Sequence, residues 1–249
     1  MKTSWEEVSK WYDKSVGTTG HYFHEHIIIP KLLDTFFFDR TNRPRLLDLG
    51  CGNGILGASV PNEVFYTGVD LSKSLIDKAK KNRKGLYKVH DLTKPLLLEE
   101  KNFTHITLIL SLQNMKSPLM VLENAKRHLA KNGKIFIVLN HPCFRIPRQT
   151  SWGIDENRKI QYRRIDRYLS PLEIPIVMNP SAKNLSQKTF SYHNPLSTYI
   201  NLLGELNLGV VQMQEWTSDK LSSGKAAKME NRAREEFPLF CLLVAQDLA

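Results

Sequence analysis

Three aspartates and a run of glycines fall where short apolar segments end. Asp48 lies two residues before Gly50 in LLDLGCGNGILG, Asp70 ends VFYTGVD, and Asp91 ends LYKVHD. Carboxylates accept hydrogen bonds from hydroxyl, amino and ammonium groups. If the three segments are parallel strands, their carboxyl ends share one edge of a sheet, where ligands bind in open α/β folds. The spacing therefore predicts a polar ligand site, although each aspartate alone could instead cap a helix.

The glycine-rich stretch predicts a sharp turn from a strand into a helix. Gly50, Gly52 and Gly54 allow the backbone to turn and to approach a ligand, with a helix N-terminus beside it. The same stretch can be read as GxGxxG through Gly57, the dinucleotide pattern, but any glycine-dense turn can satisfy that spacing. Asp48 distinguishes the two, because a carboxylate here would attract an ammonium group and repel a pyrophosphate.

Alternating apolar runs and helical patterns must position these residues. Strands are predicted at 45–50, 64–70, 86–91, 105–112 and 134–140, with helices in the gaps. One helix should begin at Ser117 as N-cap with Pro118 following, and Gly133 should end it. A later helix covers 194–209, and strands at 210–216 and 237–246 could pair antiparallel. The segment between those two strands shows no strong helical stripe.

The motif D-x-G-x-G-x-G resembles motif I of class I S-adenosylmethionine-dependent methyltransferases. The resemblance implies that Asp48, Gly50, Gly52 and Gly54 form the cofactor turn. By the same resemblance Asp70 holds the ribose hydroxyls and Leu71 flanks the adenine. Asp91 and the backbone N–H of Leu92 read the adenine amino group, and Ser111 and Gln113 lie at the methionine end.

The resemblance also implies the fold. We expect an α/β, Rossmann-like, seven-stranded and mostly parallel sheet with an antiparallel last strand, helices on both faces, an N-terminal helical segment and a cap insertion after strand 5. The chain is expected to be a single domain over 1–249. Its parts would be a lid segment (1–40), a cofactor-binding core (41–142), a substrate cap (143–192) and the rest of the sheet (193–249). No second βαβαβ half is visible for a nicotinamide enzyme.

Stretches outside the cofactor half are similar to a bacterial subgroup of these methyltransferases, over nearly the whole chain. They include LSLQNMKSP, NHPCFRIPRQTSWGID and TFSYHNPLSTY. SLQNM stands where adenine and glutamine amide methyltransferases carry N-P-P-Y, which disfavours methylation of an amide or adenine amino group. The resemblance to this subgroup does not identify the molecule that accepts the methyl group.

Two histidines are candidate catalytic bases. His141 follows the fifth predicted strand and His193 precedes a helix, so both could face the cleft, where an imidazole suits removal of a proton. The alternative for each is a structural hydrogen bond to a loop carbonyl. The candidate acceptor contacts are His24, Asn140, Phe144, Arg145, Trp152 and Tyr192.

The N-terminal stretch GHYFHEHII gathers histidines without a known metal spacing. Neither HExxH nor HxxEH is present, and no metal is expected. We expect this segment to fold over the cofactor, with Tyr12, Tyr22 or His24 closing the site; plain packing of these rings is the alternative.

Cys143 allows a rival hypothesis. RNA 5-methylcytosine methyltransferases use a cysteine just after strand five, but their companion Pro-Cys motif after strand four is absent here. An inert, partly buried thiol is the preferred interpretation.

Composition sets the broad class. The chain has 249 residues, a net charge of +10 and three cysteines without CxxC spacing. No apolar run reaches membrane-span length and the first residues lack an apolar signal core, so a cytoplasmic protein is expected. The positive charge is compatible with a nucleic-acid partner, but it is dispersed.

The preferred interpretation is an enzyme that uses S-adenosyl-L-methionine, gives S-adenosyl-L-homocysteine and methylates a planar or anionic small molecule on O, N or C. An RNA or protein methyltransferase and a non-catalytic cofactor-binding module are the alternatives. An oxidoreductase is the minor one. The oligomeric state does not follow from the sequence.

Overall fold

The computed structural model describes residues 21–38, 43–177 and 188–249, and its centre is a seven-stranded sheet. From one edge to the other the strands are β10 (Leu208–Trp216), β11 (Phe240–Asp247), β5 (Leu129–Asn140), β4 (Phe103–Ile109), β1 (Arg45–Leu49), β2 (Phe65–Asp70) and β3 (Leu86–Val89). The neighbours from β5 to β3 pair parallel, whereas β11 pairs antiparallel with both β5 and β10. The predicted fold class is confirmed.

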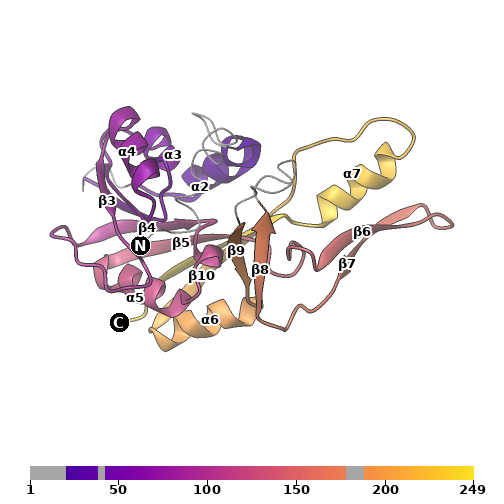
Figure 1. The fold of residues 1–249 in the computed structure, drawn as a ribbon. Helices are drawn as coiled ribbons and strands as arrows, with labels where there is room; N and C mark the ends of the chain where they lie inside the picture. The colour runs from indigo at the N-terminus through magenta and orange to yellow at the C-terminus, as the bar shows by residue number, and fades with distance from the viewer. Residues whose placement is uncertain (1–20, 39–42, 178–187) are drawn as a thin grey trace.

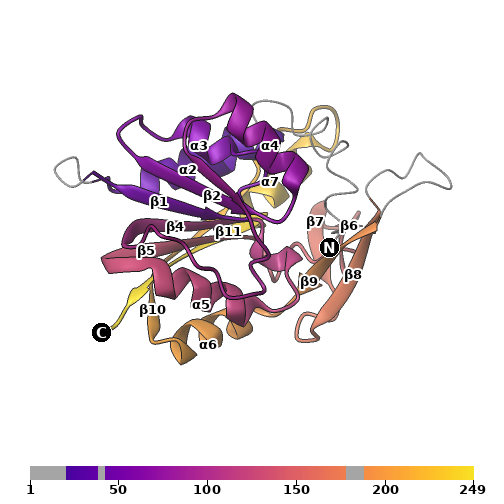
Figure 2. The ribbon, with the colours of Figure 1, turned by 60° about the vertical axis from the view of Figure 1, so that its left-hand side comes forward.

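Helices cover both faces of the sheet (Figure 2). One face carries the π-helical turn η1 (His24–Ile28) with α2 (Ile29–Thr35), α3 (Ile55–Ser59) and α4 (Lys73–Asn82). The other carries α5 (Pro118–His128) and α6 (Leu196–Glu205). Each face has its own apolar core: Leu32, Leu56 and Ile76 pack on the first, and Leu122 and Leu203 on the second. The inner strands β1, β4 and β11 are buried along most of their length, as expected for strands that are covered on both faces.

Two β-hairpins follow the fifth parallel strand and stand beyond the end of the sheet (Figure 1). They are β6 (Thr150–Asp155) with β7 (Ile160–Ile165), and β8 (Leu172–Val177) with β9 (Lys188–His193). The short 3₁₀ helix η2 (Leu112–Asn114) follows β4. The sequence predicted the cap at this place but not its strands, because proline and charged residues interrupt the alternation.

Some predicted boundaries were wrong. The helix after Ser117 ends at His128, and residues 129–133 belong to β5, so Gly133 does not terminate it. Ser117 occupies the N-cap position but its side chain makes no capping hydrogen bond. The polar segment between β10 and β11 contains a helix, α7 (Ala227–Glu236), which the sequence did not predict. Only Ala233 of α7 is buried, so an apolar stripe was not available as a signal.

Candidate functional site

A cavity of about 770 Å³ opens at the carboxyl ends of the parallel strands. Its lining includes eleven of the residues predicted for the site, namely His24, Gly50, Gly52, Asp70, Leu71, Asp91, Leu92, Ser111, Gln113, Asn140 and Tyr192. Because the strand order is β3, β2, β1, β4, β5, Asp91 and Asp70 lie at one end of the row and Asn140 at the other. The cavity has the size of a cofactor or small-molecule site.

The turn after β1 brings the backbone close to the cavity. Gly50, Gly52 and Gly54 all have positive φ, at 81°, 56° and 77°. A Cβ built on Gly50 would lie 2.4 Å from Cβ of Ser111, whose hydroxyl donates to the carbonyl of Leu49 over 2.8 Å. Only glycine allows this approach of the turn to the end of β4. Gly54 begins α3 and does not line the cavity.

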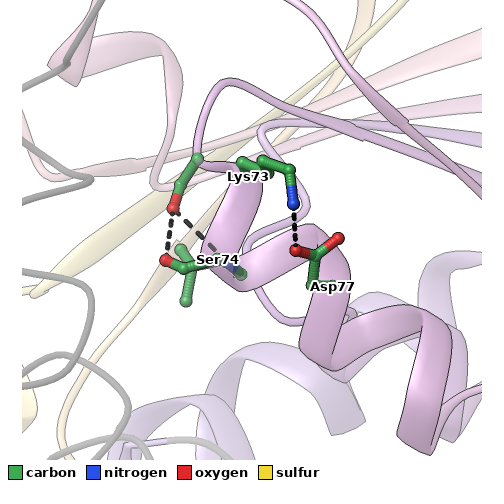
Figure 3. Close-up of polar contacts among 5 residues, drawn as sticks. Lys73, Ser74 and Asp77 are labelled. Atoms are coloured by element: carbon green, nitrogen blue, oxygen red, sulfur yellow. Dashed lines mark hydrogen bonds and ion pairs between the residues drawn. The ribbon is translucent and has the colours of Figure 1, made fainter.

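Asp70 is tied to both neighbouring turns. Its carboxylate accepts from the backbone N–H of Gly52 over 2.9 Å and from that of Ser72 over 2.8 Å. Ser72 then caps α4, because its hydroxyl accepts from the N–H of Leu75. Figure 3 shows this helix start, with the Lys73–Asp77 ion pair of 2.6 Å on its exposed side. The two hydrogen bonds from Gly52 and Ser72 therefore fix the position of the Asp70 carboxylate in the wall of the cavity.

The loop after β3 is fixed by a residue that the sequence did not single out. Asn124 of α5 is fully buried, and its amide donates to the carbonyls of Leu92 and Lys94 over 3.0 and 2.8 Å. Its carbonyl oxygen accepts from the N–H of Leu96 over 2.8 Å. Asn124 therefore shapes the loop that presents Asp91 and Leu92 to the cavity. A lone asparagine within an amphipathic helix was the available signal.

The end of β4 provides the middle of the cavity wall. Leu110 has a φ of 50°, a costly conformation for a branched side chain. Next to it, Gln113 lines the cavity, and its side-chain oxygen accepts from the N–H of Asn140 over 2.8 Å. This bond joins the ends of β4 and β5, which places Gln113 and Asn140 side by side.

Asp48 lies buried beneath the glycine turn and away from the cavity. Its side chain is 2% exposed and does not line the cavity, since Tyr66 and Thr107 donate to its two oxygens over 2.7 and 2.8 Å. Burial raises its pKa to about 6, against the lowering effect of these two hydrogen bonds. The expected contact between this carboxylate and a ligand's ammonium group is therefore wrong. Asp48 instead supports the strand beneath the glycine turn.

Tyr22 also lies outside the cavity lining. Its hydroxyl donates to Asp219 over 2.9 Å, and the ammonium of Lys220 lies 4.2 Å from the ring centroid. The expectation that Tyr22 closes the cofactor site is not met, because the side chain binds the loop after β10. His24 does line the cavity, and burial lowers its pKa to about 4. Tyr12 lies outside the described residues.

His141 does not face the cavity, so that prediction is wrong. The ring is 2% exposed, its Nε2 lies 2.7 Å from a Glu215 carboxylate oxygen, and its Nδ1 accepts from the N–H of Cys143 over 3.1 Å. Burial lowers the imidazole pKa and outweighs the raising effect of Glu215. Both ring nitrogens are occupied, so His141 organises the loop after β5 and cannot accept an acceptor's proton in this arrangement.

His193 lies in a small side chamber of about 20 Å³. The chamber adjoins the main cavity, because Gln113, Asn140, Pro147, Ser191 and Tyr192 line both. The ring Nε2 lies 2.7 Å from the carbonyl oxygen of Tyr168 and must donate to it, which matches the structural alternative considered for this histidine. Burial lowers its pKa.

The predicted acceptor contacts separate into three groups. His24, Asn140 and Tyr192 line the main cavity, and Arg145 lines the side chamber. Phe144 and Trp152 line neither, because both rings pack against Phe237. The cap contributes other groups that the sequence did not identify, among them Ile176, Thr189 and Ser191 of the β8–β9 hairpin. Which of the hairpin side chains reach the cavity depends on the pairing of β8 with β9, and no local sequence pattern predicted that pairing.

Cys143 lines neither the main cavity nor the side chamber. Its thiol interacts with Tyr168 instead: burial and a hydrogen bond with Cys143 raise the pKa of the Tyr168 hydroxyl. A role as attacking nucleophile has no geometric support. Across residues 21–38, 43–177 and 188–249, no cluster of three or more His, Cys, Asp or Glu side chains could hold a metal ion. None of the helices within those ranges is long and apolar enough to span a membrane.

The sheet order and the glycine turn define a Rossmann-like methyltransferase fold. Residues 21–170 match the family model described as a methyltransferase domain, which is more than half of the chain. The protein therefore belongs to this methyltransferase family, whose methyl donor is S-adenosylmethionine.

Individual relatives agree with this assignment. A ubiquinone biosynthesis O-methyltransferase of Coxiella burnetii is 31% identical over 97 residues, which are 36% of this chain and 41% of that relative. The chain thus matches about two fifths of the length of that relative. An S-adenosylmethionine-dependent methyltransferase of Mesorhizobium loti superposes with a TM-score of 0.66 at 23% identity, over 87% of this chain and 95% of the other.

A glycopeptide N-methyltransferase in complex with S-adenosylmethionine gives a TM-score of 0.57 at 14% identity, over 88% of this chain and 91% of the other. At these identities the two solved structures show a common fold.

Proposed function

We propose that the protein transfers the methyl group of S-adenosylmethionine to a small-molecule acceptor held beneath the β8–β9 hairpin. The observation that carries this proposal is the order of groups along one cavity. Asp91, Asp70 and the glycine turn fit the adenosine end, and Gln113 and Asn140 fit the transfer end. Because a side chain at Gly50 would collide with Ser111, glycine keeps the turn after β1 packed against the end of β4, and both residues line this cavity.

The cofactor supplies an electrophilic methyl group on a sulfonium, and this chain's residues orient the two reactants. Asp70 would accept hydrogen bonds from ribose hydroxyls, and the Asp91–Leu92 loop would read the adenine. The hairpin side chains Ile176 and Tyr192 would exclude water from the acceptor. Positioning of this kind supplies much of the acceleration in a displacement that requires no covalent enzyme intermediate. We propose residues 143–192 as the substrate cap on this basis.

An enzyme is favoured over a non-catalytic module because the cavity remains open beyond the cofactor residues, toward Asn140 and Tyr192. Cysteine-dependent methylation of cytosine in RNA is less favoured, since Cys143 lies outside the cavity lining. The Coxiella relative, an O-methyltransferase, supports a small-molecule acceptor for this chain, and the proposal does not extend to that relative's own substrate.

Calorimetry with S-adenosylhomocysteine tests the proposal through Asp70→Asn. We expect binding to weaken at least about tenfold, because a charge-assisted hydrogen bond to a ribose hydroxyl is lost. Asp77→Asn is the matched control, because Asp77 pairs with Lys73 on the exposed side of α4 and should leave binding unchanged (Figure 3). Undetectable binding by the unaltered protein, or equal binding by Asp70→Asn, would contradict the proposal.

A further inference from the structure

Arg145 carries a partly buried guanidinium that has no counter-ion among the residues described by the structure. Within the described residues its side chain makes no hydrogen bond or ion pair, and its Nη1 is buried without a partner. The guanidinium carbon lies 4.8 Å from the ring centroid of Phe240 and 5.6 Å from that of Phe23. The rings attract the cation, but they do not provide in-plane acceptors for its N–H groups. A charge in this position costs stability unless a ligand completes it.

The chamber beside Arg145 has otherwise neutral walls. Its polar lining includes Gln113, Asn140, Ser191 and His193, and none of the described residues that line it is Asp or Glu. Burial and, to a smaller extent, the neighbouring Arg163 together lower the pKa of Arg145 to about 10. Even so, the guanidinium remains protonated at neutral pH. Arg145 is therefore the one residue with a positive charge at neutral pH among the described residues that line the chamber.

The size and place of the chamber restrict what can enter it. A volume of about 20 Å³ admits one or two oxygen-sized atoms and excludes a ring. It opens beside Asn140 at the end of β5, two strands from the glycine turn of β1, a separation of about 10 Å. Asp70 and Asp91, which would repel an anion, lie on the far side of that turn.

We propose that this chamber is the subsite for a carboxylate on the acceptor, with Arg145 as its binding residue, so that the enzyme methylates a small carboxylic acid. The inference rests on the proposed function and deepens it. A guanidinium can bind a carboxylate or a phosphate, but a chamber of about 20 Å³ has room for the two oxygens of a carboxylate and not for the bulkier phosphate. The cofactor also carries a carboxylate, which is the other source of the same chemistry.

Benzoate serves as the probe, and neutral benzamide as its uncharged counterpart. Each is titrated by ligand-observed NMR into the full chain saturated with S-adenosylhomocysteine, using the unaltered protein, Arg145→Gln, Arg145→Lys and Arg158→Gln. Arg158 is the control, since it lies in the exposed turn of the β6–β7 hairpin, beside Asp155. We expect benzoate to bind at least about tenfold more tightly than benzamide, Arg145→Gln to remove that preference, and Arg145→Lys to keep part of it.

The outcomes separate the sources of the carboxylate. Equal binding of benzoate and benzamide by the unaltered protein would overturn the inference, and this readout does not require any variant to fold. Loss of S-adenosylhomocysteine affinity in Arg145→Gln with benzoate binding retained would assign the guanidinium to the cofactor instead. If the unaltered protein binds S-adenosylhomocysteine but not benzoate, the subsite is refuted while the proposed function stands.

Discussion

At the residue scale, the two predicted bases differ in what their surroundings leave available. His141 has both ring nitrogens engaged, one with Glu215 and one with Cys143. His193 uses Nε2 for the carbonyl of Tyr168, and its ring lines a chamber that we assign to a carboxylate. A neutral imidazole in that position fits a wall of the subsite better than a group that removes the acceptor's proton.

His193→Gln tests this role once an acceptor has been found by profiling metabolites with labelled cofactor. Glutamine can still donate to the Tyr168 carbonyl, so kcat and its pH profile should stay within about threefold, while KM for the acceptor rises. If His193 were a base, its lowered pKa would place an acid limb below pH 6.5. Loss of that limb together with a large fall in kcat would contradict our assignment.

At the scale of elements, the shape of the loop after β3 depends on α5, a helix that lies about 30 residues further along the chain. Asn124 makes three hydrogen bonds to loop backbone groups from the buried side of α5. The loop carries Asp91 and Leu92, so its shape determines how the adenine would be read. The predicted cofactor residues therefore need a partner that no glycine or aspartate motif contains.

Asn124→Leu should destabilise the fold by about 1–3 kcal/mol, because buried backbone groups lose their partners. S-adenosylhomocysteine affinity should fall several-fold as the loop loosens. Urea unfolding and calorimetry measure the two effects. Arg127→Ala on the exposed face of α5 is the control and should change neither. Unchanged affinity in Asn124→Leu would show that the loop holds its shape without this side chain.

At the scale of the whole molecule, buried ionisable groups link stability to pH. Burial lowers the pKa of His24 and of His105 to about 4. Between pH 6.5 and 4 the unfolded chain then binds more protons at these sites than the folded chain, so acid destabilises the fold. Asp48 acts in the opposite direction, because its raised pKa of about 6 lets the folded state keep a proton.

His24 and His105 together outweigh Asp48, and the lowered pKa values of His141 and His193 act in the same direction as those of His24 and His105. The free energy of unfolding should therefore fall by at least about 2 kcal/mol from pH 7 to pH 5. Urea unfolding at both pH values measures it. His105→Gln should remove roughly half of the contribution that His24 and His105 make together, whereas Asp48→Asn should steepen the dependence. Equal stability of the unaltered protein at pH 7 and pH 5 would contradict this balance.

The sequence by itself predicted the parallel strands and the edge of the sheet at which their carboxyl ends meet. Strand ends and glycine turns are local features, so Gly50, Gly52, Asp70 and Asp91 could be predicted to gather at one edge. The motif and the alternation of strands and helices also sufficed for the fold class and for a cap after the fifth strand. Such predictions succeed because apolar periodicity and turn chemistry act over a few residues.

Only the tertiary structure decided which side chains reach the cavity. Asp48 belongs to the motif, yet Tyr66 and Thr107 occupy it; His141 follows a strand, yet Glu215 engages it from 74 residues away. Arg145 was one arginine among several in the cap until its missing partner distinguished it. The physical reason is that burial and hydrogen-bond partners arise between segments distant in sequence, where spacing along the chain carries no information about them.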